Sequence, residues 1–467
     1  STLSICIVFS PLFMLTGVAA FVFVPLALAV VFAMIASFIL SRTLVPTLAS
    51  LFLPPQHGHG AAHHGATGRF GRIVDTLLAH LEALMVRIAR LLLARKAIPI
   101  AGLAAALGLG AVSAANIGRE FFPETDAGMI RLYVRAQTGM RLEETAQRFA
   151  EVQTEIRSII PEAEVGFVVE SIGSPEPINL AWVESGVVGS FDGEILVQLT
   201  KPHGPTSSYI SKIRKRLNER FPEHTVYFRP ADATAQTLSA GTQTGIEVRV
   251  IGRDGQGNAE IARSLADEIK TVPGAVDVAQ RQVRDLQSYY LNIDRVRALQ
   301  LGITPQEAAT ALLSVLGAWG TVSPNFWSDP AQGFSYTVQV VAPPANLTSL
   351  EQILNTPVKT NAQGQQITLR SFASLELRKI AANIDRSTLQ PTTTILANVE
   401  GSDLGSVYAK VAEAVDRRRG ELKPGNRIEI AGQARAMEQA YGEMLSGLLL
   451  AAVFVYLVMV VNFQSWL

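Results

Sequence analysis

Apolar residues divide this chain into membrane-type ends and a polar centre. Residues 1 to 41 contain no charged side chain, and Val18 to Leu40 is apolar almost throughout. Uncharged runs return from Ala97 to Ile117 and from Met444 to Leu467. A helix needs about 20 mostly apolar residues to cross the hydrocarbon layer of a bilayer. The pattern predicts a partial helix ending near Met14, two crossings, a large polar region and a final crossing.

The loop between the first two complete crossings has two parts. Residues 56 to 68 form a low-complexity tract that contains His57, His59, His63 and His64. Metal sites need ligands held by packed elements and second-shell partners, which this tract lacks, so a flexible linker is favoured over a weak metal site. From Phe70 to Leu92, apolar residues recur at three- and four-residue spacing. This predicts an amphipathic helix on a membrane surface, with a packed core helix as the alternative.

Charge predicts the side of the membrane on which this loop lies. Between Pro54 and Lys96 there are six arginine or lysine residues and two acidic residues. Cytoplasmic loops carry an excess of positive charge. We therefore expect the loop in the cytoplasm and the large polar region on the opposite side, which in a bacterium with two membranes is the periplasm.

The polar centre repeats one pattern four times. An alternating, strand-like segment is followed by an amphipathic helix and a second strand. The copies run over residues 130–169, 195–228, 246–278 and 394–430. Paired units of this kind fold into an antiparallel sheet with helices on one face, so we expect two ferredoxin-like α+β sandwiches. An α+β module is inserted between the third and fourth copies, with a helix capping box at Thr304 and Glu307.

Composition argues against several classes of function. Basic and acidic residues number 40 each, so the formal net charge is zero and no nucleic-acid footprint is visible. The one cysteine, Cys6, lies in an apolar run, which excludes a disulfide framework and a thiolate metal site. No Ser-His-Asp, paired-carboxylate or glycine-rich phosphate pattern has a suitable context. We expect neither an enzyme nor a cofactor.

Several motifs, taken in order, resemble the RND family of efflux permeases. Residues 122–128 (FPETDAG) follow a predicted membrane helix, as at the start of the second periplasmic loop of that family. Residues 291–303 resemble the strand and short helix that lead into its docking module. Ala318-Trp319-Gly320 and the segment from Val455 to Trp466 match as well. The order of elements agrees along the whole chain, so the resemblance covers all of it.

The resemblance implies that the chain is the central fragment of a longer permease, with eight regions. These are part of transmembrane helix 5 with helix 6 (1–53), a cytoplasmic linker with the amphipathic surface helix (54–96), transmembrane helix 7 (97–117), a first periplasmic porter subdomain (118–235), the first part of a second porter subdomain (236–284), a docking subdomain (285–391), the second part of the second porter subdomain (392–436) and transmembrane helix 8 (437–467).

The resemblance also implies how the complete protein works. It would be a multi-pass homotrimer in the bacterial inner membrane, surrounded by lipid, that uses the proton gradient together with a periplasmic adaptor and an outer-membrane channel. The predicted spans contain no acidic, basic or histidine side chain, so the proton-relay groups are expected outside this chain. A chain that serves only as a scaffold or partner-binding module is a further alternative, which a gene encoding both halves of the permease would exclude.

The substrate class is predicted from the methionines. A branch that exports soft metals such as Cu(I) is expected to carry thioethers in the porter region. Between Arg119 and Ala436 only Met129 and Met140 are present. We therefore expect the branch that exports hydrophobic or amphiphilic compounds, with heavy-metal cation efflux as the alternative.

Six candidate substrate-binding residues follow from the resemblance: Phe167, Ile172, Ser174, Leu196, Tyr227 and Arg281. Phe167 matches a pocket phenylalanine of the family. Ile172 and Leu196 fall where relatives often carry further phenylalanines, which weakens the expectation for polyaromatic drugs. Ser174 opens the loop that gates the pocket, and Tyr227 and Arg281 lie near the entrance. The alternative is that Phe167 and Tyr227 fill the sandwich core. No metal ligand is assigned.

Overall fold

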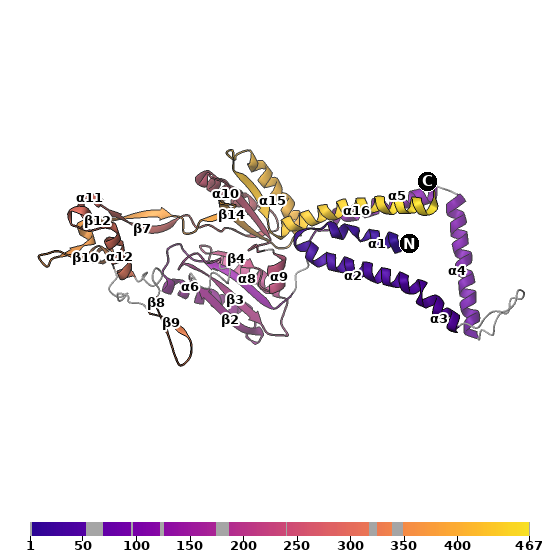
Figure 1. The fold of residues 1–467 in the computed structure, drawn as a ribbon, viewed down its shortest axis with the longest axis horizontal. Helices are drawn as coiled ribbons and strands as arrows, with labels where there is room; N and C mark the ends of the chain where they lie inside the picture. The colour runs from indigo at the N-terminus through magenta and orange to yellow at the C-terminus, as the bar shows by residue number, and fades with distance from the viewer. Residues whose placement is uncertain are drawn as a thin grey trace, which may run out of the picture.

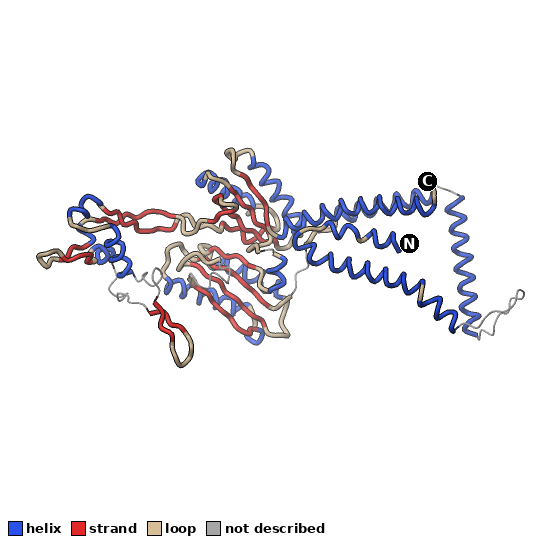
Figure 2. Tube along the Cα trace, viewed as in Figure 1, coloured by secondary structure: helices blue, strands red, loops and turns tan. Residues whose placement is uncertain are grey.

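The computed structural model describes residues 2–52, 69–94, 97–121, 126–173, 186–239, 241–316, 325–338 and 349–466. The molecule is elongated, with long helices at one end and the sheets toward the other (Figure 1). Figure 2 shows helices without strands at one end of the molecule and strands together with helices toward the other. The fold is therefore a mixture of helix and sheet, as predicted. The histidine tract at 57–64 lies outside the described residues.

Among the described residues, two helices are long and apolar enough to cross a membrane. One is α2 (Gly17–Arg42), which α3 (Leu44–Phe52) continues, and the other is α16 (Gln433–Phe463). The expected crossing at 97–117 forms the apolar helix α5 (Ala97–Asn116). The N-terminal segment is short, with α1 (Thr2–Val8) and a 3-10 helix (Ser10–Met14). The amphipathic segment forms α4 (Arg69–Ala94).

Helix α16 begins earlier than the apolar pattern predicts. The uncharged run starts at Met444, but the helix follows strand β15 (Arg427–Ala431) after one residue, Gly432. Gly432 has a φ of +94°, and a Cβ there would lie 2.7 Å from the Gly245 carbonyl oxygen, so this turn requires glycine. Ala434 and Met437 are buried in the core of the adjoining sandwich. A single helix thus connects the sheet region with the last apolar segment.

The first sandwich has the element order strand-helix-strand twice. Its elements are β1 (Met129–Arg135), α6 (Leu142–Ile159), β2 (Val165–Ile172), β3 (Asp192–Leu199), α8 (Thr206–Arg220) and β4 (Thr225–Arg229). The antiparallel sheet has the order β2-β3-β1-β4. Phe149 of α6 and Ile213 of α8 pack on Leu132 and Ile195 of the sheet, so both helices cover one face. Helix α9 (Ala233–Leu238) leads to the second sandwich.

The second sandwich repeats this arrangement around an insertion. Its elements are β5 (Ile246–Ile251), α10 (Gly255–Ile269), β6 (Ala275–Gln280), β14 (Gln390–Val399), α15 (Leu404–Arg419) and β15. Strand β14 pairs with both β5 and β6, and β5 pairs with β15. A short strand, β13 (Asp385–Ser387), pairs with β14. Leu265 and Val411 are fully buried against Val248 and Ile395, so helices again cover one face.

The inserted module is connected by a two-stranded ribbon. Strand β7 (Leu286–Ile293) pairs with β12 (Ala373–Ile380). At its end a small core joins α11 (Arg295–Gln300), α12 (Pro305–Leu316), β10 (Pro357–Thr360) and β11 (Gln366–Thr368), with α14 (Leu350–Leu354) nearby. The capping box is confirmed, because Glu307 N–H donates to Thr304 Oγ1 (3.2 Å) and Thr304 N–H donates to Glu307 Oε2 (2.7 Å). Strands β8 (Asn325–Ser328) and β9 (Ser335–Val338) form a hairpin.

Candidate functional site in the cleft between the two sandwiches

The described helices α6 and α8 cover one face of the first sheet, and we call the other face the open face. Side chains alternate along a strand, so Leu132 and Val134 of β1 point to the helices while Arg131, Tyr133 and Arg135 lie on the open face. Tyr133 is paired in register with Tyr227 of β4. The side chains of β3 that pair in register with Arg131, Tyr133 and Arg135 lie on the same face. The open face therefore extends across β3 to the edge strand β2.

The predicted site residues do not come together in one pocket. Phe167 is 51% exposed on the edge strand, and Leu196 lies on the same open face, partly buried. Tyr227 also belongs to this face but is buried. Ile172 packs on the opposite, helix-covered side. Ser174 lies outside the described residues, and Arg281 belongs to the second sandwich, where it pairs with Asp385.

Neither aromatic candidate fills the core of its own sandwich. Phe167 is exposed, while Tyr227 is buried between the two sandwiches. Its ring stacks on that of Tyr133, with centroids 4.6 Å apart, and both contact Ala279 of β6 and Leu396 of β14. Burial raises the pKa of Tyr227 to about 12, so its hydroxyl stays neutral and donates to Gln243 Oε1 at 3.0 Å. A role of either residue in substrate binding stays a prediction.

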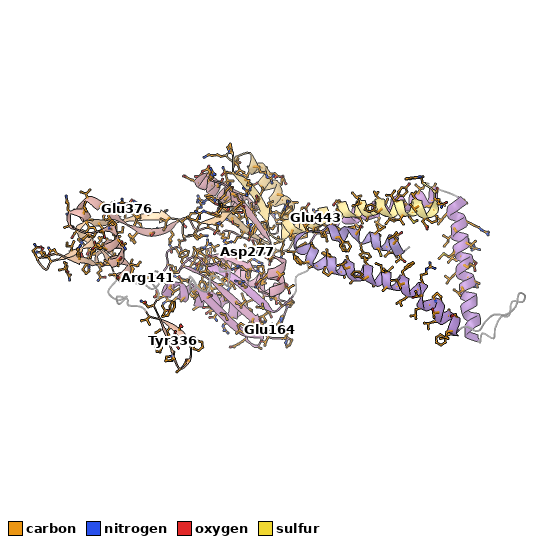
Figure 3. The ribbon with its side chains drawn as sticks, in the orientation of Figure 1. Arg141, Glu164, Asp277, Tyr336, Glu376 and Glu443 are labelled. Atoms are coloured by element: carbon orange, nitrogen blue, oxygen red, sulfur yellow. The ribbon has the colours of Figure 1, made fainter. Side chains whose placement is uncertain are left out.

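A buried ion pair fixes the sandwiches to each other on one side of the tyrosine stack. Arg214 of α8 donates to both carboxylate oxygens of Asp277 in β6, at 2.7 and 2.9 Å, and also pairs with Glu400 at 2.8 Å. Asn398 of β14 donates to Asp277 Oδ2 (2.9 Å) and to the Phe228 carbonyl oxygen (2.8 Å). Asp277 has a φ of +55°, a strained conformation for a residue with a Cβ. The hydrogen bonds between the sandwiches hold Asp277 in this conformation. Figure 3 labels Asp277 between the two sheets.

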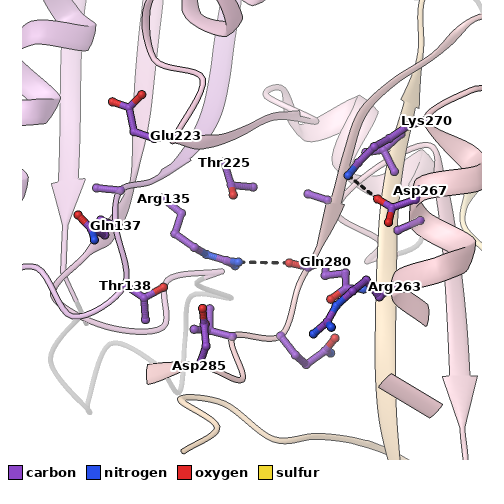
Figure 4. A pocket seen from close by; sticks show the side chains of 16 residues that line it. Arg135, Gln137, Thr138, Glu223, Thr225, Arg263, Asp267, Lys270, Gln280 and Asp285 are labelled. Atoms are coloured by element: carbon purple, nitrogen blue, oxygen red, sulfur yellow. Dashed lines mark hydrogen bonds and ion pairs between the residues drawn. The ribbon is translucent and has the colours of Figure 1, made fainter. Parts of the chain in front are cut away.

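On the other side of the stack, the sandwiches separate to leave a cleft of about 470 Å³ (Figure 4). Arg135, at the end of β1, crosses the gap and donates to the carbonyl oxygens of Gln280 (3.2 Å) and Arg281 (2.9 Å). The lining contains three basic and three acidic side chains together with amides and hydroxyls, and none of the described residues that line it is aromatic. The charged ones are Arg135, Arg263, Lys270, Glu223, Asp267 and Asp285.

The charges of the cleft come from both walls. Glu223 belongs to the first sandwich, and Asp267 of α10 and Asp285 belong to the second. Asp267 pairs with Lys270 at 2.9 Å, so part of the acidic charge is offset locally. Within the described parts of the chain, no group of three or more His, Cys, Asp or Glu side chains is placed to hold a metal ion. The cleft is thus a polar, charge-balanced space and not a preformed coordination site.

Sequence reasoning missed every residue that lines this cleft. The lining side chains come from segments far apart in the chain, such as the end of β1 at Arg135 and the solvent face of α10 at Arg263. On a strand end or a helix surface, a charged residue has the pattern of an ordinary solvated position. Only the packing of the two sandwiches distinguishes these residues from other surface charges.

The chain belongs to the AcrB/AcrD/AcrF family, whose model matches residues 1–467. This confirms the RND permease family that the motifs indicate; the permeases of this family are transporters of the inner membrane that generally form trimers and work with adaptor and outer-membrane channel proteins.

Relatives from two branches are similar to the chain over nearly its full length. The cation efflux system protein CzcA of an Alcaligenes species is 24% identical over 99% of this chain and 42% of its own length. The toluene efflux pump membrane transporter TtgB of Pseudomonas putida is 25% identical over 98% of this chain and 42% of its own. The crystal structure of a heavy metal efflux pump covers the whole chain with a TM-score of 0.76 at 23% identity, spanning 44% of that pump. The chain thus spans less than half the length of these relatives.

Proposed function

We propose that the permease to which this chain belongs exports heavy-metal cations. The relatives support this over the amphiphile branch that the methionine argument favours, because several cation efflux proteins match nearly the whole chain and the structure of a heavy metal efflux pump covers all of it. Methionine content tests only for soft ions such as Cu(I). Divalent ions of intermediate softness take oxygen and nitrogen ligands, so a porter region poor in methionine remains compatible with their export.

The polar lining of the cleft is the observation that carries the proposal. Pockets for bulky apolar ligands are lined mainly by apolar and aromatic side chains. This cleft instead presents the carboxylates of Glu223, Asp267 and Asp285, and carboxylate oxygens bind divalent cations. Arg135, Arg263 and Lys270 offset that charge, which keeps binding weak. Weak binding suits transport, since the ion must leave as readily as it enters.

Export of amphiphilic compounds is the second candidate. Phe167 and Val169 are each about half exposed on the edge strand, at 51% and 50%, beside Leu196 on the open face. These side chains form an apolar strip of the kind that an amphiphile contacts. The similarity to the toluene pump TtgB supports this candidate as well.

The rest of the mechanism is proposed from the family. The complete permease would form a trimer in the inner membrane, with the sandwiches in the periplasm and α4 on the cytoplasmic surface. It would deliver its cargo through an adaptor and an outer-membrane channel. Proton-relay residues would lie outside this chain, whose apolar helices contain no acidic, basic or histidine side chain between Gly17 and Ser41 or between Met444 and Phe463.

A growth assay with the complete permease distinguishes the two substrates. The host is a bacterium without its own metal and drug pumps, exposed separately to zinc or cobalt salts and to a cationic dye. We expect the permease to raise metal tolerance, and Glu223→Gln combined with Asp267→Asn to abolish most of that gain. Glu260→Gln is the matched control, because Glu260 is an exposed carboxylate of the same helix α10 that does not line the cleft.

Growth in the presence of the dye is the measurement that can contradict the proposal. Dye tolerance that Phe167→Ala removes, with no change in metal tolerance on expression of the permease, would establish the amphiphile candidate. Trimer formation by each variant, measured in detergent, shows that the loss is not caused by misfolding.

A further inference from the structure

A series of buried hydrogen bonds begins at the turn before β3. The Asp192 carboxylate accepts hydrogen bonds from the backbone N–H groups of Val188 (3.0 Å) and Gly189 (2.9 Å). It also accepts one from the Tyr133 hydroxyl. Asp192 and Tyr133 are both fully buried. The turn at 188–189 is therefore fixed to the centre of the open face through one carboxylate.

The same series ends at the cleft. The Tyr133 hydroxyl accepts a hydrogen bond from Arg135 Nε at 3.0 Å. The terminal nitrogens of Arg135, which is only 8% exposed, donate to the Gln280 and Arg281 carbonyl oxygens of the second sandwich. One hydroxyl thus connects a buried carboxylate, which holds the turn, with a buried guanidinium, which bridges the cleft.

The two buried charges depend on each other. An isolated charge is costly to bury, and the cost falls when an opposite charge and good hydrogen bonds accompany it. The partners of Arg135 on the second sandwich are neutral carbonyls, so Asp192 is the anion that completes its environment through Tyr133. If the turn moves away from Asp192, or if the Tyr133 hydroxyl is removed, the Arg135 guanidinium loses this anionic environment. It is then better solvated by water in the cleft than in the position that bridges the two sandwiches. The bridge to the second sandwich then opens.

We propose that Asp192 and Tyr133 are positioning residues that act through Arg135 and couple the turn at 188–189 to closure of the cleft. Coupling between two sites is reciprocal, so opening the cleft must also loosen the turn. A ligand that contacts the open face near the turn would thereby change access to the cleft without entering it. The proposal rests on the cleft as the functional site of the proposed function but not on which substrate uses it.

The first test measures the width of the cleft in the complete, purified permease. Spin labels are placed at Gln137 and Arg263, one on each wall, in a background where Cys6 and any other cysteine are replaced. The distance between the labels is measured by pulsed electron paramagnetic resonance. Tyr133→Phe removes the hydroxyl that bonds both Asp192 and Arg135, so it should raise the ratio of wide to narrow clefts at least about tenfold, the effect of losing a hydrogen bond to a charged group.

The matched control is Tyr227→Phe. It removes the hydroxyl from the other ring of the same stack, where the partner is Gln243 and not Arg135. Its distance distribution should equal that of the parent protein. Equal distributions for Tyr133→Phe and Tyr227→Phe would overturn the proposal.

The second test measures the backbone amides of the turn, at the other end of the hydrogen-bond series. Amide hydrogen exchange at Val188 and Gly189 should accelerate in Arg135→Gln by about tenfold, because reciprocity carries the same coupling in both directions. Unchanged exchange at these amides would show that Arg135 and the turn are independent. Both tests are made without substrate, so their failure is separate from a failure of metal export in the growth assay.

Discussion

At the scale of single residues, His224 is a histidine that the fold keeps neutral. Its side chain is 2% exposed, and its ring lies 5.3 Å from that of Phe221. Among the described residues, its Nδ1 has no hydrogen-bond partner. Burial lowers the pKa of His224 below its ordinary value of 6.5. The unfolded chain therefore binds a proton more readily than the folded one.

This burial predicts a loss of stability in mild acid. The stability that the folded state gains by burying neutral His224 is fully present above pH 6.5. It is lost as the pH falls from 6.5 toward the lower pKa of the folded state. Hydrogen-exchange protection of α8 amides, corrected for intrinsic rates, should decline between about pH 7.5 and about pH 5.5. In His224→Phe the decline should be smaller, and an identical decline in both proteins would contradict the assignment.

At the scale of elements, the start of α15 is held by Asp403. Its carboxylate accepts hydrogen bonds from the backbone N–H groups of Ser406 (2.9 Å) and Arg119 (3.0 Å), so it caps α15 and also anchors the segment after α5. Hydrogen bonds from Ser406 and Arg119 lower the pKa of Asp403 to about 2. The stabilisation is present above the ordinary pKa of 3.8 and is lost as the pH falls toward 2.

Removing this cap should destabilise the second sandwich. Asp403→Ala is expected to lower the free energy of unfolding by about 1 kcal/mol, as loss of an N-cap does, while Asp403→Asn should retain most of it. Urea denaturation followed by α15 hydrogen exchange measures the difference. Asp416→Ala, an exposed carboxylate later on the same helix, is the control, and an equal effect of both alanine variants would argue against the cap.

At the scale of the whole molecule, the two sandwiches unfold together if the buried contact between them is strong. Arg214 and Asp277 are only 11% and 3% exposed, and breaking one partner of a buried ion pair commonly costs about 3–5 kcal/mol. Arg214→Gln should therefore divide thermal unfolding into two separable transitions. Arg216→Gln is the matched control, because Arg216 lies on the same helix but pairs with Glu155 inside the first sandwich. A single transition in Arg214→Gln would show that the tyrosine stack and the linking segments suffice.

Much of the fold was predictable because it depends on local patterns. Alternating residues such as those of Ile130–Arg135, and helical spacing such as Ile261, Leu265 and Ile269, fix which side of each element is buried. These patterns predicted the strands and helices of both sandwiches and the capping box at Thr304. The start of α16 at Gln433 was missed, since Gly432 and the buried Met437 show their roles only when β15 and β5 are in place.

The candidate site was not predictable in the same way. The sequence by itself determined the apolar helices, the paired sandwich units and the motifs of the permease family, because each depends on neighbouring residues or fixed spacing. Only the tertiary structure decided that Tyr227 is buried between the sandwiches, that Phe167 is exposed, and that Arg135 meets Gln280 and Arg281 across a cleft. The physical reason is that these features depend on how segments far apart in the chain pack together, such as Arg135 and Gln280, which are 145 residues apart. A charged residue at such a contact follows the same local pattern as one that faces water.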